Sequence, residues 1–326
     1  MKESFETDKN SSNLSLKSII IPVYKNESNI PALLKSLEKM IEEVGGMVEV
    51  VFVVDGSPDN SYQLLCNRLP ETNVVSKVIL LSKNFGSFAA IRLGLENASG
   101  HYFSVMAADL QEPPELVIKS FEILSNEEVD VVVAARSSRK DSFFSKLPAK
   151  VFWYLYRKMV ISDMPEGGVD LFSCNDIFRN QLLRLTESHS SLIAQVFWLG
   201  CRRKVIKYNR LERESGVSAW SFKKKVNYMM DSVFSFSDLP LKLLTRTGFL
   251  GMFVFAICGF ITFVSKLLGV IDVQGYATTF LTVGFFGAMN LFGLGIVGSY
   301  TWRTYENTKQ RPLAICIEKK TFNSND

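Results

Sequence analysis

Short apolar runs separated by polar loops and amphipathic stretches characterise the N-terminal part of the chain. Runs of mostly β-branched or aromatic residues that end in a polar loop are typical of buried strands. Such runs predict strands at residues 18–24, 48–54, 76–81, 102–106 and 129–134. Asn29 is a candidate helix cap and Pro31 suits a first helical turn, so a helix is expected there, and another begins near Phe88. Strands alternating with helices predict an α/β fold with a mainly parallel sheet and helices on both faces.

Two later segments combine aromatic residues with basic ones. Residues 140–159 predict an amphipathic helix that lies against a membrane or leads toward one. A core helix with an aromatic stripe is the open alternative for this segment. Residues 226–244 predict a similar interfacial helix.

Two long apolar stretches follow, at residues 247–270 and 276–302. As a helix, each is long enough to cross about 30 Å of hydrocarbon. A pair of buried helices in a soluble protein is the alternative, but the short connection favours a transmembrane hairpin. The connection carries only Asp272, whereas basic residues flank both sides, so the positive-inside rule places both chain ends in the cytoplasm. The flanking residues are Lys242, Arg246, Arg303, Lys309, Arg311, Lys319 and Lys320.

Composition narrows the class of function. The net charge of +4 over 326 residues is too small for a nucleic-acid binder. Basic clusters at 202–204 and 223–225 fit anionic lipid headgroups, although solvated helix faces explain each cluster equally well. Five cysteines without a CxxC spacing indicate reduced thiols in a cytosolic compartment, and two histidines exclude a His-rich metal site. The polar N-terminus is not expected to be a signal peptide.

Polar clusters follow four of the predicted strands, at residues 25–27, 55–59, 82–86 and 107–115. In parallel α/β sheets, ligands bind beyond the carboxyl ends of the strands. The convergence of these loops therefore predicts one ligand site at one edge of the sheet. No Gly-x-Gly-x-x-Gly or Walker loop is present, so dinucleotide and P-loop sites lack their glycines.

Candidate metal ligands lie within these loops. Asp109 and Gln111, with Asp59 on a neighbouring loop, offer the hard oxygen atoms that suit a divalent cation bridging a diphosphate. A turn or cap role is the alternative for each of them. For Asp55 taken alone the turn role is equally compatible, whereas the sequence around Asp109 favours the metal role.

These motifs resemble the family 2 glycosyltransferases. The chain is most similar to their polyprenyl-phosphate subgroup, which includes dolichol-phosphate mannose synthase and the bactoprenol glucosyltransferases. The similarity extends from about residue 17 to 317 and also includes residues 210–220, 305–306 and 311–313. The motifs that carry it are Ile20-Ile21-Pro22-Val23-Tyr24-Lys25-Asn26-Glu27, Val54-Asp55-Gly56-Ser57-Pro58-Asp59-Asn60-Ser61, Ser82-Lys83-Asn84-Phe85-Gly86 and Asp109-Leu110-Gln111-Glu112-Pro113-Pro114-Glu115.

The resemblance implies a glycosyltransferase A-type fold that inverts the anomeric carbon while moving a sugar from a nucleotide sugar, expected to be a UDP-sugar, to a polyprenyl phosphate. The acceptor is already an anion, so its oxygen attacks without a strong base. Asp170 is nevertheless a candidate base, with a turn role as the alternative. Asp109 and Gln111 are the implied ligands of Mg²⁺ or Mn²⁺. The implied donor-binding residues are Pro22, Tyr24, Glu27, Asp55, Ser57, Asp59, Asn84, Asp109 and Gln111, and the implied phosphate-binding residues are Arg210, Arg213 and Ser218.

The expected organisation follows from these motifs. A flexible N-terminus (1–16) precedes a cytosolic glycosyltransferase domain (17–222), interfacial helices (223–246), a transmembrane hairpin (247–302) and a cytosolic tail (303–326). The expected location is the inner, cytoplasmic membrane, with two passes. Expected partners are the nucleotide sugar, the polyprenyl phosphate and the membrane, without nucleic acid. Glycines in the second apolar stretch allow helix packing between subunits, so a homo-oligomer is an open option.

In two motifs the family usually has a further Asp shortly before the Asp that this chain keeps, and this chain has an apolar residue there. These apolar residues are Val54 and Ala107. The loss of both Asp residues is compatible with a different donor, weaker metal dependence or impaired activity. A membrane-anchored protein that binds a nucleotide sugar without transferring it is therefore one alternative. A processive polysaccharide synthase is another, but residues 195–198 lack the Arg of its Gln-x-x-Arg-Trp motif.

Overall fold

The computed structural model describes residues 16–136, 154, 156–158, 160–165, 168–187, 190–209, 222–268 and 275–323. The chain divides into two compact units. The sheet unit comprises Met1–Lys225 together with Pro312–Asp326, and the helical unit comprises Val226–Arg311. The C-terminal residues therefore belong to the same unit as the N-terminal half of the chain.

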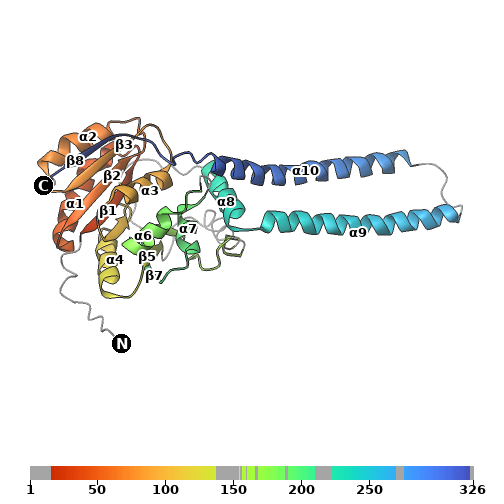
Figure 1. Ribbon diagram of the computed structural model, residues 1–326, viewed down its shortest axis with the longest axis horizontal. Helices are drawn as coiled ribbons and strands as arrows, with labels where there is room; N and C mark the ends of the chain where they lie inside the picture. The colour runs from red at the N-terminus through yellow and green to blue at the C-terminus, as the bar shows by residue number, and fades with distance from the viewer. Residues whose placement is uncertain are drawn as a thin grey trace, which may run out of the picture. The chain divides into compact units, whose positions relative to one another are not determined.

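The sheet unit contains one mixed sheet in the order β7-β5-β6-β4-β1-β2-β3-β8 (Figure 1). β6 and β8 run antiparallel to their neighbours, and the other described strands are parallel to one another. This confirms the α/β fold and the five predicted strands, whereas β6, β7 and β8 were not predicted. The strands are β1 Lys17–Val23, β2 Val48–Val54, β3 Ser76–Leu81, β4 Tyr102–Val105, β5 Val131–Arg136, β6 Val169–Asn175, β7 Arg203–Tyr208 and β8 Cys316–Phe322.

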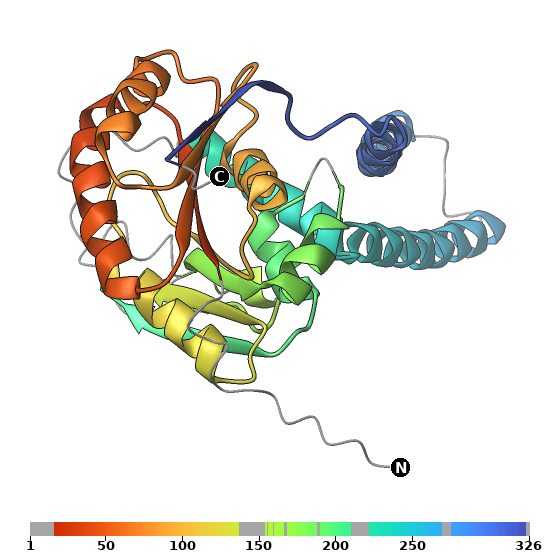
Figure 2. The same ribbon diagram turned by 60° about the vertical axis from the view of Figure 1, so that its left-hand side comes forward.

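Helices cover both faces of this sheet (Figures 1 and 2). α1, α2 and α4 pack on one face through a continuous hydrophobic cluster, and α3 packs on the other face against β1 and β2. Helix α1 begins one residue after the predicted cap, with a proline in its first turn as expected. The helical segments are η2 Glu27–Asn29, α1 Ile30–Val44, α2 Ser61–Arg68, η3 Leu69–Glu71, α3 Ser87–Asn97, α4 Glu115–Asn126, α6 Asp176–Leu183 and α7 Leu192–Trp198.

The central strands are buried on both faces, as their mainly apolar runs predict. Every residue of β2 is buried. Helix α3 approaches so closely that a Cβ atom on Gly94 would lie 2.4 Å from Cγ2 of Ile20. Since α3 begins directly after the loop that follows β3, this close packing also fixes where that loop ends.

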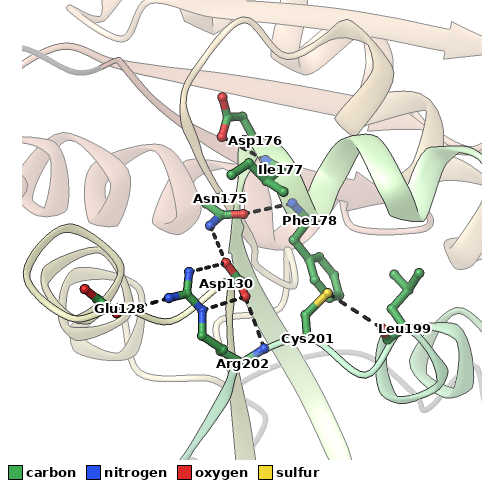
Figure 3. A network of polar contacts seen from close by, with 9 residues as sticks. All are labelled: Glu128, Asp130, Asn175, Asp176, Ile177, Phe178, Leu199, Cys201 and Arg202. Atoms are coloured by element: carbon green, nitrogen blue, oxygen red, sulfur yellow. Dashed lines mark hydrogen bonds and ion pairs between the residues drawn. The ribbon is translucent and has the colours of Figure 1, made fainter. Parts of the chain in front are cut away.

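Asp130 joins three strands at the amino edge of the sheet, where β5 and β7 begin and β6 ends (Figure 3). Its carboxylate accepts hydrogen bonds from Nε, Nη2 and the backbone N–H of Arg202, each at 3.1 Å. Nδ2 of Asn175 donates a further bond at 3.1 Å, and Oδ1 of the same side chain caps α6 by accepting from the N–H of Phe178. The bonds from Arg202, assisted by Asn175, outweigh burial and lower the pKa of Asp130.

The C-terminal strand β8 corrects the sequence interpretation of residues 303–326 as a tail. β8 pairs antiparallel with β3, from Ser76 opposite Phe322 to Leu81 opposite Cys316. It therefore forms one edge of the sheet, visible as the dark blue strand in Figure 2. The chain leaves the sheet unit after β7, passes through the helical unit and returns to complete the same sheet.

The helical unit consists of α9 Leu239–Leu267, α10 Tyr276–Thr308 and most of α8 Phe222–Phe236. α10 starts at the predicted residue, but α9 runs without a break across the predicted boundary at 246/247. Among the described residues, one helical stretch, Thr282–Thr308, is long and apolar enough to cross a membrane. The two-helix transmembrane hairpin therefore stays a prediction. Most of the helix predicted at 140–159 lies outside the described residues.

Side chains of α8 and α10 hold these two helices together within the helical unit. Arg303 forms an ion pair with Asp231 at 2.7 Å, and its guanidinium lies over the ring of Phe234. The ring of Tyr300 meets the same phenyl ring edge-on, with 5.2 Å between the centroids. Close to the start of α9, Leu244 packs against Gly293 of α10. A Cβ atom added to Gly293 would lie 3.2 Å from Cδ1 of Leu244.

Candidate active site

The four polar loops expected to converge do so. β4, β1, β2 and β3 are neighbours in the sheet and parallel, so their carboxyl ends meet at one edge. Two non-glycine residues in these loops adopt left-handed backbone conformations, Lys25 (φ 56°) and Leu110 (φ 54°). Such conformations cost about 1–3 kcal/mol and concentrate at ligand-binding sites. The carboxyl edge is therefore the candidate site.

The loops after β1 and β2 are joined by their own side chains. Asp59 accepts a hydrogen bond from the N–H of Glu27 at 3.1 Å, and the Glu27 carboxylate accepts bonds from the N–H and Nδ2 of Asn60 at 3.0 and 3.1 Å. The Ser57 hydroxyl donates to Asp59 at 2.6 Å and accepts from the N–H of Lys25 at 2.8 Å. Three predicted donor-binding residues thus form one interlocked structure.

Asp59 is kept ionised by this arrangement. Partial burial raises its pKa, but hydrogen bonds from the Ser57 and Ser61 side chains and from two backbone N–H groups outweigh that effect. The resulting pKa lies below the usual value for an aspartate. The hydrogen bonds of this loop therefore favour the charged form of Asp59.

Asp55 joins the loop after β2 to the loop after β3. Its buried carboxylate accepts hydrogen bonds from the N–H groups of Phe85 at 2.7 Å and Gly86 at 2.9 Å. The next residue, Gly56, has φ 54°, and a Cβ on it would lie 2.2 Å from the carbonyl carbon of Lys83. Asp55 is thus more than a local turn residue, because it holds a loop 30 residues away.

The remaining predicted donor residues occupy the same edge. Pro22 is half-buried in β1, opposite Val53, and Tyr24 follows the strand with its N–H bonded to Oδ1 of Asn26 at 3.0 Å. Asn84 is exposed in the loop whose backbone Asp55 holds. Its side chain is therefore presented to solvent from a fixed loop.

The loop after β4 carries the candidate metal ligands. Asp109 and Gln111 are half-buried and flank the left-handed Leu110, and the N–H of Gln111 lies 3.4 Å from Oδ1 of Asp109. Among the residues that the structure describes, no group of three or more His, Cys, Asp or Glu side chains could hold a metal ion. One carboxylate and one amide oxygen do fit Mg²⁺ or Mn²⁺ in the mode where substrate phosphates and water complete the coordination.

The two departures from the family pattern have different environments. Val54 is completely buried in the hydrophobic cluster beneath α1, α2 and α4, so its side chain faces the core. Ala107 is half-buried, two residues before Asp109. In this chain only the second position borders the candidate metal ligands.

Asp170 lies in β6, so the interpretation of this residue as a turn is wrong. Both carboxylate oxygens are engaged: Nε and Nη2 of Arg136 bind them as a two-point ion pair, and the Tyr208 hydroxyl donates to one of them at 2.7 Å. Burial, followed by the charge of Asp170 and its hydrogen bond, raises the pKa of Tyr208. Burial lowers the pKa of Arg136, but the bond to Asp170 outweighs it and the pKa rises.

This trio belongs to the same edge as the four loops. Arg136 ends β5, Tyr208 ends β7 and Asp170 stands at the start of the antiparallel β6. Arg136 was not predicted as a site residue because the expected strand ended at residue 134, and Tyr208 was not predicted because no strand was expected at β7. The predicted phosphate-binding residues Arg210, Arg213 and Ser218 lie outside the described residues.

The sequence model described as Glycosyl transferase family 2 matches residues 18–206, which span β1 through most of β7. The chain belongs to this family. It is a glycosyltransferase, as the motifs at the carboxyl edge predicted.

Relatives match this glycosyltransferase along nearly its whole length. CsbB of Bacillus subtilis, named as a glycosyltransferase, is 37% identical over 306 residues, covering 93% of this chain and 92% of the relative. The undecaprenyl-phosphate 4-deoxy-4-formamido-L-arabinose transferase of Pectobacterium atrosepticum is 31% identical over 308 residues, with 90% of each chain covered. A solved structure of the mannosyltransferase PcManGT from Pyrobaculum calidifontis is 14% identical with a TM-score of 0.45, covering 92% of this chain and 91% of the other.

Proposed function

We propose that this glycosyltransferase moves a sugar from a nucleotide sugar, expected to be a UDP-sugar, to a polyprenyl phosphate at the cytosolic face of a membrane. The observation that carries the proposal is the convergence of Asp109, Gln111 and the interlocked loops at one sheet edge, in a chain that also contains the apolar stretch Thr282–Thr308. The match to an undecaprenyl-phosphate sugar transferase covers both parts. An enzyme with this architecture can meet a soluble donor and a membrane-bound acceptor.

The order of the strands and helices along the chain supports a membrane segment with two crossings. β1 to β7 precede the helical unit and β8 follows it, yet all eight strands belong to one sheet. A segment that leaves a domain and rejoins it crosses a membrane an even number of times. With Thr282–Thr308 as one crossing, α9 is the helix that supplies the other. The basic residues on both sides of the pair favour a cytosolic sheet unit and cytosolic chain ends.

The donor is proposed to bind across the interlocked loops. Tyr24 and Asn84 line the surface from the ends of β1 and β3, while Asp55, Glu27 and Asp59 hold those loops in place. Asp109 and Gln111 would hold Mg²⁺ or Mn²⁺ against the diphosphate, and the bound cation would stabilise negative charge on the leaving nucleotide. Loops held in this way would orient the bound donor so that its anomeric carbon is open to attack.

The acceptor is proposed to supply its own nucleophile. A phosphate monoester carries negative charge at neutral pH, so one of its oxygens attacks the anomeric carbon while the nucleotide diphosphate departs, with inversion. Asp170 was a candidate base, but its oxygens are already engaged by Arg136 and Tyr208. We therefore assign Asp170 the positioning of these two side chains and no proton transfer.

Transfer of label from a panel of radioactive nucleotide sugars into organic-soluble lipid tests the proposal. Membranes that contain the full chain receive undecaprenyl phosphate, with and without EDTA. We expect one donor to label the lipid, and EDTA and Asp109→Asn to abolish the labelling. Asp163→Asn, which changes an exposed aspartate, is the matched control.

A second candidate function is nucleotide-sugar binding without transfer, and Ala107 beside Asp109 is the feature that favours it. No labelled lipid from any donor, combined with saturable binding of one nucleotide sugar to the folded protein, would establish this alternative. Labelled polymer that stays in the aqueous phase would instead indicate a processive synthase.

A further inference from the structure

The C-terminal strand reaches the candidate active site. The pairing of β8 with β3 continues beyond the last residue of β3, because the N–H of Ser82 donates to the carbonyl oxygen of Ile315 at 3.0 Å. Ser82 opens the loop that contains Asn84. Since β8 is antiparallel to β3, its first residues lie at the carboxyl edge, as the dark blue strand in Figure 2 illustrates.

The other end of β8 is anchored at the amino edge of the sheet. Nδ2 of Asn323 lies within hydrogen-bond distance of three backbone carbonyl oxygens, those of Leu69 (3.0 Å), Thr72 (2.8 Å) and Val74 (3.2 Å). Within the strand, Nζ of Lys319 donates to Oδ1 of Asn97 at the end of α3, at 2.9 Å. The strand is thus fastened along its length to elements that precede it by more than 200 residues.

The loop 82–86 is therefore held from two sides. Asp55 accepts hydrogen bonds from the N–H groups of Phe85 and Gly86 near the end of the loop, and Ile315 accepts one from Ser82 at its beginning. Between these fixed points, Lys83 and Asn84 are exposed. A loop with both ends tied presents its central side chains in one arrangement, which lowers the entropy lost when a ligand binds.

We propose that β8 is a positioning element of the donor site, which acts through the bond between Ile315 and Ser82 to fix the loop that presents Asn84. The identity of the ligand, a nucleotide sugar, rests on the function proposed above. Loosening the start of β8 then weakens donor binding without changing the groups that take part in the transfer.

Ser82→Pro tests this in the full-length protein. Proline at this position lacks the backbone N–H that donates to the carbonyl oxygen of Ile315, so the bond between the loop and β8 is lost. The residues of β8 and the Asn323 anchor are unchanged. Ser82→Ala is the matched control, since it changes the same exposed side chain and keeps the N–H.

Two measurements are compared between these variants. Hydrogen exchange without substrate is expected to be about tenfold faster at the amides of Phe85 and Gly86 in Ser82→Pro than in Ser82→Ala, because local opening becomes easier. The KM for the donor is expected to rise about tenfold, which corresponds to about 1.4 kcal/mol, with kcat within about twofold of the control. A merely destabilising change would lower the amount of folded protein without this separation of KM from kcat.

Unchanged exchange at these amides would overturn the positioning role, whatever the ligand proves to be. An unchanged donor KM despite faster exchange would overturn the link to donor binding. Absence of nucleotide-sugar binding by the unaltered protein would contradict the proposed function instead, leaving the exchange result valid. If Ser82→Pro does not fold, Asn323→Asp releases the far end of β8 and is judged by the same two measurements.

Discussion

Glu27 and Asp59 hold each other's loops: the Asp59 carboxylate accepts the N–H of Glu27 at 3.1 Å, and the Glu27 carboxylate accepts the N–H of Asn60 at 3.0 Å. The bonds are reciprocal in the way of a capping box, although they join two loops instead of one helix end. The loops after β1 and β2 consequently behave as one body. A substitution of either residue is therefore expected to disturb both loops. The disturbance would extend to Tyr24, which directly follows β1 at the site.

Glu27→Gln and Asp59→Asn are therefore expected to be strongly non-additive. Each removes one side of the interlocked loops and is expected to cost about 1–3 kcal/mol of unfolding free energy, because backbone donors lose their charged acceptors. The double variant is expected to cost clearly less than the sum of the single variants. Urea unfolding of all four proteins measures this, and strict additivity would show that the two carboxylates act independently.

Gly56→Ala is expected to destabilise the protein more than Gly45→Ala. Both glycines have similar left-handed φ values, 54° and 63°, so alanine is strained at each. A Cβ at Gly45 meets nothing within 4 Å, whereas one at Gly56 would collide with the backbone of Lys83. Gly45→Ala therefore reports the cost of a positive φ at a site where the added Cβ collides with nothing. Thermal unfolding and donor KM measure the difference, and equal effects of the two variants would exclude a special role for the contact.

Lys77→Met is expected to cost about 3–5 kcal/mol of stability, because it leaves the buried carboxylate of Glu49 without its cation. The two groups are 3.0 Å apart, and Glu49 also accepts a hydrogen bond from Ser18 at 2.7 Å. A double variant with Glu49→Gln is expected to recover part of the loss, since no buried charge remains. Denaturant unfolding reports both values. A loss below about 1 kcal/mol for Lys77→Met would mean that water reaches the carboxylate.

Stability is expected to fall in acid partly through Asp130. Its folded-state pKa is lowered, first by the bonds from Arg202, so its contribution is fully present above the unfolded pKa of about 3.9. The contribution disappears as pH falls from about 4 through the lowered folded-state pKa. Asp130→Asn should flatten this part of the stability curve, whereas Glu71→Gln at an exposed site should not. Unfolding free energies between about pH 2 and 7 provide the comparison, and parallel curves for the two variants would contradict it.

The first five strands were predictable because runs such as 48–54 are apolar except for Glu49, a composition that suits a strand buried on both faces. β8 gave no such signal: Cys316-Ile317-Glu318-Lys319-Lys320-Thr321-Phe322 is half polar, as suits an edge strand, and its partner lies about 240 residues earlier. β7 begins with basic residues, for which lipid contacts and a solvated helix face were equally compatible interpretations. Edge strands are specified by distant pairing, which local patterns do not contain.

The candidate site was predictable in its location but not in its internal bonding. Polar residues after successive parallel strands necessarily share an edge, so Asp55, Asp59 and Asp109 could be grouped from sequence alone. The partners of Asp55 are the backbone N–H groups of Phe85 and Gly86, and every residue except proline carries such a group. The bonding of Asp170 to Arg136 and Tyr208 likewise depends on three strands whose order no motif reveals.

The late position of β8 in the chain imposes an order on the synthesis of the protein. A ribosome completes β1 to β7 first, then α9 and α10, and only afterwards the seven residues that close the edge of the sheet beside β3. A nascent chain therefore exposes the unpaired edge of β3 until its helical segment has been made. The last strand to leave the ribosome covers that edge, so the sheet becomes complete only in a chain that already carries its helical unit.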